Sequence, residues 1–130
     1  MGLTREKKIL VVEDEADMAG LLKERLKAAG YQVHTASSGK AGLSYAAEHE
    51  SDLVILDLVL PDIHGYEVCK ELRKLSNPWG QPILMLTAMS QPIDQLRGFA
   101  HGADAYLTKP FDSHELLKTV AMLLGESVTA

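Results

Sequence analysis

The sequence predicts one α/β domain, a doubly wound parallel sheet of five strands covered by five helices. Its 130 residues, 46% hydrophobic and 24% charged, suit a single globular domain with one core, which we expect at about residues 8–125. Short apolar runs alternate strictly with stretches of helical periodicity, the order typical of this fold class. The apolar runs are continuous rather than alternating, so helices should cover both faces of the sheet.

The first strand is predicted at residues 9–12, where an apolar, mostly β-branched run stops at an acidic segment. A helix follows over 16–29, and Gly30 can take the left-handed conformation that ends a helix. The next strand and helix are expected at 31–36 and 39–49. A third apolar run, 53–56, ends at Asp57, and turn residues then lead into a helix with an apolar stripe at Val68, Leu72 and Leu75.

The fourth strand is predicted at 83–86, ending at Thr87. A helical stripe follows, closed by Gly102 and made of Ile93, Leu96, Phe99 and Ala100. A brief fifth strand at 105–108 precedes Lys109 and a proline. Asp112 and Glu115 then have the spacing of a capping box. They open a last helix whose inward residues are Leu116, Leu117, Val120 and Leu123.

The charge balance, 13 Lys and Arg against 18 Asp and Glu, gives a formal net charge of −5. Nucleic acid is therefore not an expected direct partner, because phosphate binding requires a basic face. The single cysteine, Cys69, forms no internal disulfide, and no segment resembles a membrane span or a secretory leader. The sequence favours a cytoplasmic protein that has no membrane partner.

Polar residues stand where four of the strands end: Glu13, Asp14, Asp57, Thr87 and Lys109. The carboxyl ends of parallel strands meet at one edge of the sheet, and ligands of such folds bind there. These five side chains are therefore expected to converge on one site.

Three carboxylates in one crevice repel one another, by roughly 4 kcal/mol per pair at ~4 Å and an effective dielectric constant near ~20. Lys109 offsets part of that charge, but a divalent cation does so better. An all-oxygen ligand set suits Mg²⁺, with Mn²⁺ as an alternative, and the lack of Cys or His disfavours zinc. A carboxylate beside such an ion can attack phosphorus, so Asp57 is the predicted nucleophile, with Glu13 and Asp14 holding the ion. Lys109 and Thr87 would then contact the phosphoryl oxygens.

Four segments in this order resemble the receiver domain of two-component response regulators over nearly the whole chain. They are LVVEDE at 10–15, ILDLVLPDIHGYE at 55–67, LTA at 86–88 and GADAYLTKPF at 102–111. The resemblance implies a flavodoxin-like sheet with strand order 2-1-3-4-5. It also implies that the peptide bond between Lys109 and Pro110 is cis.

The resemblance further implies a phosphorelay role. Asp57 would accept a phosphoryl group from a sensor histidine kinase, from a phosphotransfer protein or from a small phosphodonor. Asp14, Asp57 and the backbone carbonyl of Val59 would bind Mg²⁺ directly, and Glu13 would bind it through water. Lys109 would pair with the phosphoryl group. The domain would not be an enzyme but a phosphoacceptor that assists its own phosphorylation and dephosphorylation.

The switch that the resemblance implies consists of Thr87, whose hydroxyl would move to the new phosphate, and Tyr106, which would rotate inward. The surface that changes would be the fourth helix, fifth strand and fifth helix, roughly residues 93–124. That surface would control an output domain or protein, and a phosphorylation-dependent homodimer is a further partner that the family allows.

Three other functions compete with this interpretation. A metal-dependent phosphohydrolase usually has a second Asp two residues after its nucleophile, where this chain has Val59. A flavin mononucleotide carrier would need a phosphate loop after the first strand, where this chain has acids. A receiver-like module that binds partners without phosphorylation ranks second, because the residues for phosphorylation are all present.

Several conspicuous side chains have ordinary interpretations. His64 is expected to be solvated in its loop, Cys69 to pack in the core, and Trp79 to anchor a loop. The basic start of the chain, Arg5, Lys7 and Lys8, is expected to be a solvated tail.

Overall fold

The computed structural model describes residues 6–75 and 80–126. Its elements alternate as expected: β1 (Lys8–Val12), α1 (Ala16–Ala28), β2 (Gln32–Ala36), α2 (Gly39–Glu48), β3 (Leu53–Leu56), α3 (Gly65–Leu75), β4 (Ile83–Thr87), α4 (Pro92–Ala100), β5 (Ala105–Thr108) and α5 (Ser113–Leu123). The bounds predicted from the sequence are correct to within two residues. The expected helix stop at 76–78, Trp79 and Arg5 lie outside the described residues.

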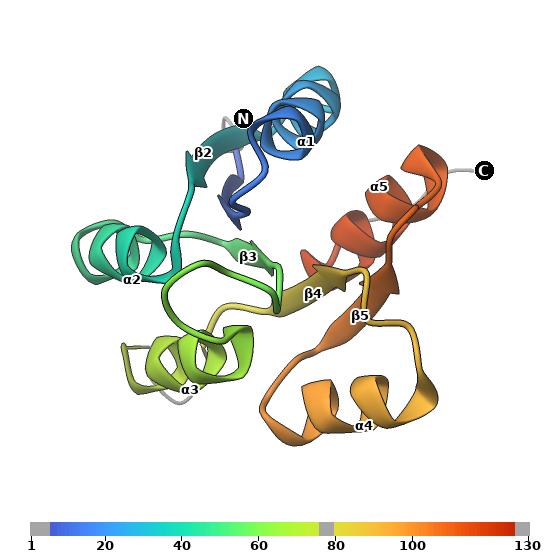
Figure 1. Ribbon diagram of the computed structural model, residues 1–130. Helices are drawn as coiled ribbons and strands as arrows, with labels where there is room; N and C mark the ends of the chain where they lie inside the picture. Colours follow the sequence, from blue (N-terminus) through green and yellow to red (C-terminus); the bar gives the residue numbers. More distant parts are fainter. Residues whose placement is uncertain (1–5, 76–79, 127–130) are drawn as a thin grey trace.

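The five strands form one parallel sheet in the order β2-β1-β3-β4-β5. Successive side chains of a strand point to opposite faces, so each strand contributes residues to the apolar cores on both faces of the sheet. Leu10 and Val12 pack with α2 and α3, whereas Ile9 and Val11 pack with α1 and α5. Figure 1 shows α1 and α5 on one side of the sheet and α2, α3 and α4 on the other. The doubly wound architecture is thereby confirmed.

The helix ends follow local chemistry. Gly30 and Gly102 have φ angles of 99° and 109°, the left-handed conformation that their positions after α1 and α4 require. Asp112 caps α5 by accepting a hydrogen bond from the backbone N–H of His114, at 3.0 Å. The peptide bond between Lys109 and Pro110 is cis, as the family resemblance implies.

Two apolar stripes that the sequence places on helices are partly turned to solvent. On α3, Val68 and Leu72 are buried but Leu75 is 51% exposed. On α4 the departure is larger, since Ile93, Leu96 and Phe99 are exposed. No helix in the described part of the chain is long and apolar enough to cross a membrane.

Candidate functional site

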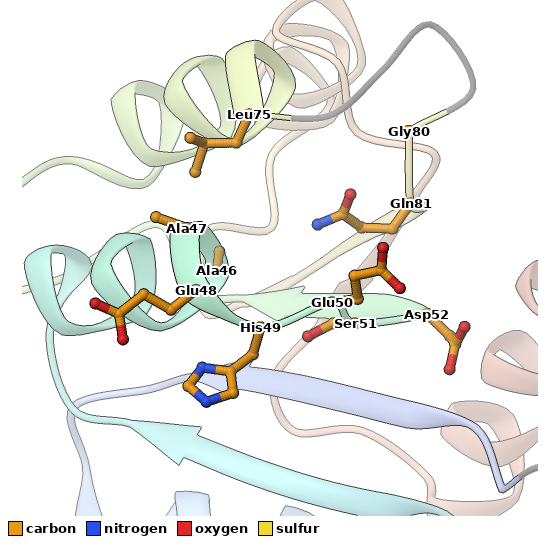
Figure 2. A pocket seen from close by; sticks show the side chains of 10 residues that line it. All are labelled: Ala46, Ala47, Glu48, His49, Glu50, Ser51, Asp52, Leu75, Gly80 and Gln81. Carbon is orange, nitrogen blue, oxygen red and sulfur yellow. The ribbon is translucent and has the colours of Figure 1, made fainter.

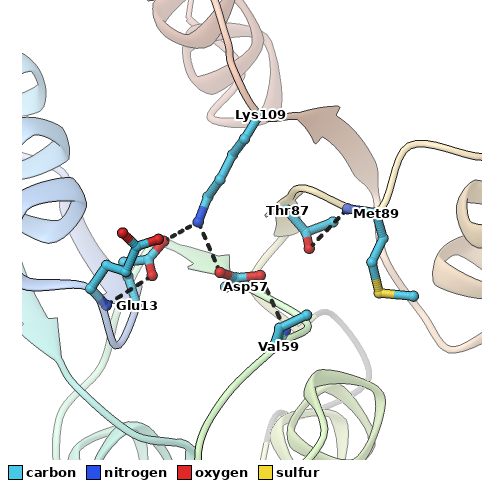
Figure 3. A network of polar contacts seen from close by, with 7 residues as sticks. Glu13, Asp57, Val59, Thr87, Met89 and Lys109 are labelled. Carbon is cyan, nitrogen blue, oxygen red and sulfur yellow. Dashed lines mark hydrogen bonds and ion pairs between the residues drawn. The ribbon is translucent and has the colours of Figure 1, made fainter.

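Four of the five residues predicted to converge are in close contact at the carboxyl edge of the sheet. Ligand oxygens of Glu13, Asp14 and Asp57 lie within 4.8 Å of one another. The Lys109 ammonium donates to Glu13 Oε1 at 2.5 Å and to Asp57 Oδ2 at 2.8 Å (Figure 3). Thr87 is completely buried at the end of the neighbouring strand β4. The sequence-based convergence of acids and lysine is therefore confirmed.

The register of the sheet brings these residues together. Val12 of β1 pairs with Leu56 of β3, so the residues that follow them, Glu13 and Asp57, lie side by side. The Asp57 N–H donates to the Val12 carbonyl at 3.1 Å. Backbone hydrogen bonds thus fix the positions of side chains that are far apart in the sequence.

Burial and pairing act against each other in the electrostatics. Burial raises the pKa of Glu13, while its contacts with Lys109 and the Glu15 N–H lower it only in part. Burial would lower the pKa of Lys109, but hydrogen bonds with Asp57 and Glu13 outweigh burial and hold that pKa above its ordinary value. Lys109 is thus a firmly charged cation between two buried carboxylates, whose side chains are 2% and 8% exposed.

The loops after β3 and β4 complete the rim of the site. The Val59 N–H donates to Asp57 Oδ1 at 3.2 Å, and the Met89 N–H donates to Thr87 Oγ1 at 3.4 Å (Figure 3). Tyr106 is half-buried, and its hydroxyl donates to the Met89 carbonyl at 2.7 Å. One backbone segment, at Met89, therefore contacts both residues of the expected switch.

The donor set fits a small hard cation. In the described part of the chain these three carboxylates are the group of ligating side chains close enough to share an ion. All of them offer oxygen, which Mg²⁺ and Mn²⁺ prefer. Asp14 is exposed while Glu13 and Asp57 are buried, so the cluster opens to solvent on one side.

Asp62, which the sequence indicates only as a turn residue, makes a contact between two distant segments. Its carboxylate leaves the loop after β3 and accepts hydrogen bonds from the backbone N–H groups of Gly39 and Lys40, both at 2.8 Å. These bonds hold the pKa of Asp62 below its ordinary value, with the Lys40 bond the largest cause. The signal was an acidic residue in a loop, but its distant partner could not be read from the sequence.

The histidines have structural roles. Tyr45 stacks between His34 and His49, with ring centroids 3.8 Å and 4.2 Å away. His64 is exposed as expected, yet its Nδ1 also accepts from the Tyr66 N–H at 3.1 Å. Cys69 is a fully buried free thiol, which confirms its packing role.

A separate hollow of about 430 Å³ lies at the opposite edge of the sheet (Figure 2). It is bordered by the end of α2 and by the residues that lead into β3 and β4, including Glu48, His49 and Gln81. None of the five predicted site residues lines it. This hollow and the cluster of acids and lysine are thus at different ends of the strands.

Comparison with known proteins identifies the family of the chain. Residues 9–121 match the family model of the response regulator receiver domain. The DNA-binding dual master transcriptional regulator RpaA of Synechocystis is 43% identical over 90% of this chain and 48% of its own length. The alkaline phosphatase synthesis transcriptional regulatory protein PhoP of Bacillus subtilis is 44% identical over 95% of this chain and 51% of its own length.

The chain spans about half the length of the curated relatives it matches. Among solved structures, the chemotaxis protein CheY4 of Vibrio cholerae is similar with a TM-score of 0.86 and 35% identity, covering 92% of this chain and 99% of that one. A putative response regulator from Chloroflexus aurantiacus has a TM-score of 0.86 and 37% identity, covering 94% of this chain and 100% of that one. With a matching family model, relatives and fold, the chain belongs to the response regulator receiver domains, the signalling domains of two-component systems.

Proposed function

We propose that this domain accepts a phosphoryl group on Asp57 and so controls an output partner. The observation that carries the proposal is the placement of Asp57. Its carboxylate is only 8% exposed, is held by Lys109 at 2.8 Å and lies within ligand distance of two further acids. A buried carboxylate among other charges is typical of a reactive group rather than a surface one.

In the proposed transfer, an Asp57 carboxylate oxygen attacks the phosphorus of a kinase phosphohistidine. The new O–P bond forms as the P–N bond breaks, and the departing imidazole keeps the electron pair and takes up a proton. A phosphotransfer protein supplies the same phosphohistidine, and in a small acyl phosphate the leaving group is a carboxylate. Little acid–base chemistry is required, because phosphoryl transfer depends mostly on positioning and charge neutralisation.

The other residues then have separate tasks. Glu13, Asp14, Asp57 and the Val59 carbonyl are the proposed holders of Mg²⁺, or Mn²⁺ in its place, with Glu13 acting through water. The ion would supply positive charge that neutralises the phosphoryl oxygens. Lys109 is already charged and directed at Asp57, so it offers a second positive partner and assists both phosphorylation and dephosphorylation. Thr87 would give its hydroxyl to a phosphoryl oxygen.

The output surface that we propose spans about residues 93–124, with Tyr106 as its link to the site. Its α4 part carries exposed Ile93, Leu96 and Phe99, and contiguous apolar exposure is typical of interaction surfaces. The partner would be an output domain or protein, or a second phosphorylated copy. Nucleic acid and membrane are not proposed as direct partners of this domain.

We propose that residues of about 8–125 act as one unit in the cytoplasm, where the unpaired thiol of Cys69 would stay reduced. The relative named as a DNA-binding regulator is a longer protein, of which this chain covers 48%, so DNA binding is not proposed for the part matched here.

The test is incubation with acetyl phosphate and Mg²⁺, followed by intact mass measurement. A gain of one phosphoryl group is expected in the wild type and is lost with EDTA or in Asp57→Asn. Asp112→Asn is a matched control, since that carboxylate caps α5 by accepting from the His114 N–H and asparagine caps a helix about as well. A gain that persists in Asp57→Asn would assign the phosphoryl group to another residue. No gain in the wild type would favour the rival function, partner binding without phosphorylation.

A further inference from the structure

The loop between β3 and α3, residues 57–64, is held at three points. At its base, the Gly65 N–H donates to the Leu58 carbonyl at 2.9 Å. At the site, the Val59 N–H donates to Asp57 Oδ1. At its far side, Asp62 reaches across to the start of α2. Val59 therefore lies between the hydrogen bond of Gly65 to Leu58 at the base of the loop and the contact of Asp62 with α2, which we call the anchor.

The anchor is a dense set of hydrogen bonds. Asp62 Oδ1 accepts from Gly39 at 2.8 Å and from Ile63 at 2.9 Å, and Oδ2 accepts from Lys40 at 2.8 Å. A carboxylate at a helix N-terminus is favoured by the free N–H groups and by the helix dipole. The contact joins two segments that are 22 and 23 residues apart, so it ties the loop to another element rather than to itself.

The approach of the two segments depends on a residue without a side chain. A Cβ at Gly39 would lie 2.9 Å from Val68 Cγ2, 3.2 Å from Ile63 Cβ and 3.3 Å from Asp62 Oδ1. The start of α2 is thus packed against the loop and against α3, and a Cβ at Gly39 would require Val68 and the loop to shift.

We propose that Asp62 is a positioning residue for the cation site, acting by pinning the loop to α2 so that the Val59 backbone stays turned toward Asp57. This inference rests on the proposed function for the identity of the site. Asp62 itself does not touch the cation in this scheme. Residues that orient ligands from behind are worth about 10- to 100-fold in metal affinity.

The experiment compares Asp62→Ala with Ser38→Ala in the full chain. The Ser38 hydroxyl accepts from the Ala41 N–H at 3.1 Å, so its loss also weakens the start of α2 but leaves the loop contact intact. Two quantities are measured: amide hydrogen exchange of Val59 without metal, by NMR, and the Kd for Mg²⁺, by calorimetry.

In Asp62→Ala, exchange of the Val59 amide should accelerate and the Kd for Mg²⁺ should rise about 10-fold. Ser38→Ala should change neither quantity. Gly39→Ala, which disturbs the same contact from the α2 side, should reproduce both effects, and Asp62→Asn, which keeps one acceptor oxygen, should be intermediate. If Asp62→Ala is too unstable to measure, Gly39→Ala and Asp62→Asn test the positioning role of Asp62 in its place.

Unchanged Val59 exchange and Mg²⁺ affinity in Asp62→Ala would overturn the inference, as would equal effects in Ser38→Ala, because Asp62 would then only cap α2. Failure of the proposed function has a different signature. In that case the wild type itself would bind no Mg²⁺ and gain no phosphoryl group, while Val59 exchange would still report whether Asp62 pins the loop.

Discussion

Two regions of this domain depart from the usual rule of burial in opposite directions. At the carboxyl edge of the sheet, Glu13 and Asp57 are charged groups with exposures of only 3% and 6%. On α4, Leu96 is apolar and 66% exposed, with Ile93 and Phe99 beside it at 46% and 47%. Buried charge and exposed apolar surface are the two observations that most often mark function.

The two regions differ in whether the chain itself supplies a partner for the side chains. The buried carboxylates have a partner within the chain, because Lys109 contacts both. The apolar side chains of α4 are left to solvent by the fold. Tyr106 lies between the two regions, with its hydroxyl on Met89 next to the site and its ring centroid 6.5 Å from that of Phe99. One region is thus completed internally, and the other is available to a partner.

The largest effect is expected when Lys109, the internal partner of the buried carboxylates, is removed. Lys109→Met should lower the free energy of unfolding by about 3 kcal/mol, because it leaves two buried carboxylates without their cation. Urea denaturation at neutral pH measures this. Lys74→Met is the control, since that lysine forms an exposed ion pair with Glu71 and its loss should cost little. Equal losses in both variants would show that the buried pairing is not what stabilises the site.

The same variant should have an altered pH dependence. Burial already raises the pKa of Glu13, and removing Lys109 removes interactions that lower it. A group whose pKa is raised by folding contributes stability below its ordinary value, here 4.5, and loses that contribution as pH rises through the folded value. The stability deficit of Lys109→Met relative to the wild type should therefore shrink from neutral pH toward 4.5. A stability deficit that stays constant over this pH range would mean that Lys109 does not lower the pKa of Glu13.

A smaller effect is expected at the link between the regions. Tyr106→Phe removes the hydrogen bond to the Met89 carbonyl and should cost about 1 kcal/mol of unfolding free energy. Tyr45→Phe is the comparison variant, because that ring is held by stacking between two histidines. If Tyr106→Phe is as stable as the wild type, the hydroxyl contact does not tie Tyr106 to the loop after β4.

The smallest effect is expected on α4. Leu96→Ala should change the free energy of unfolding by less than about 0.5 kcal/mol, since the side chain is mostly in water. Leu72→Ala on α3 removes the same side chain from a position that is 1% exposed and should cost about 2 to 5 kcal/mol. A large loss of unfolding free energy in Leu96→Ala would show that this side chain contributes to the core and is not free for a partner.

The sequence predicted the strands and the site well for a common reason. In a parallel sheet the carboxyl ends of all strands lie along one edge, so Glu13, Asp57 and Lys109 could be placed at that edge without knowing any contact. The order of the strands is different, because no local pattern encodes it and only the family resemblance supplied it. The site therefore follows from local patterns plus one rule of sheet geometry.

What the sequence could not show depends on contacts between distant segments. Helical spacing identified α4 but not that its apolar stripe faces solvent, because periodicity does not say which face the sheet covers. The hydrogen bonds from Asp62 to α2 join segments whose approach depends on the absence of a side chain at Gly39. Asp112 is a local exception: it caps α5 as expected, but it does so by accepting from the His114 N–H and not through a capping box with Glu115.

The pairing of Lys109 with Glu13 and Asp57 also bears on when the site comes into existence during synthesis. Lys109 is 96 residues from Glu13 and 52 from Asp57. Chains emerge from their N-terminus, and contacts between distant residues form late in folding. A nascent chain that ends before β5 carries every acid of the site but not its cation, so the contacts of Lys109 with Glu13 and Asp57 cannot form until the last strand has been synthesised.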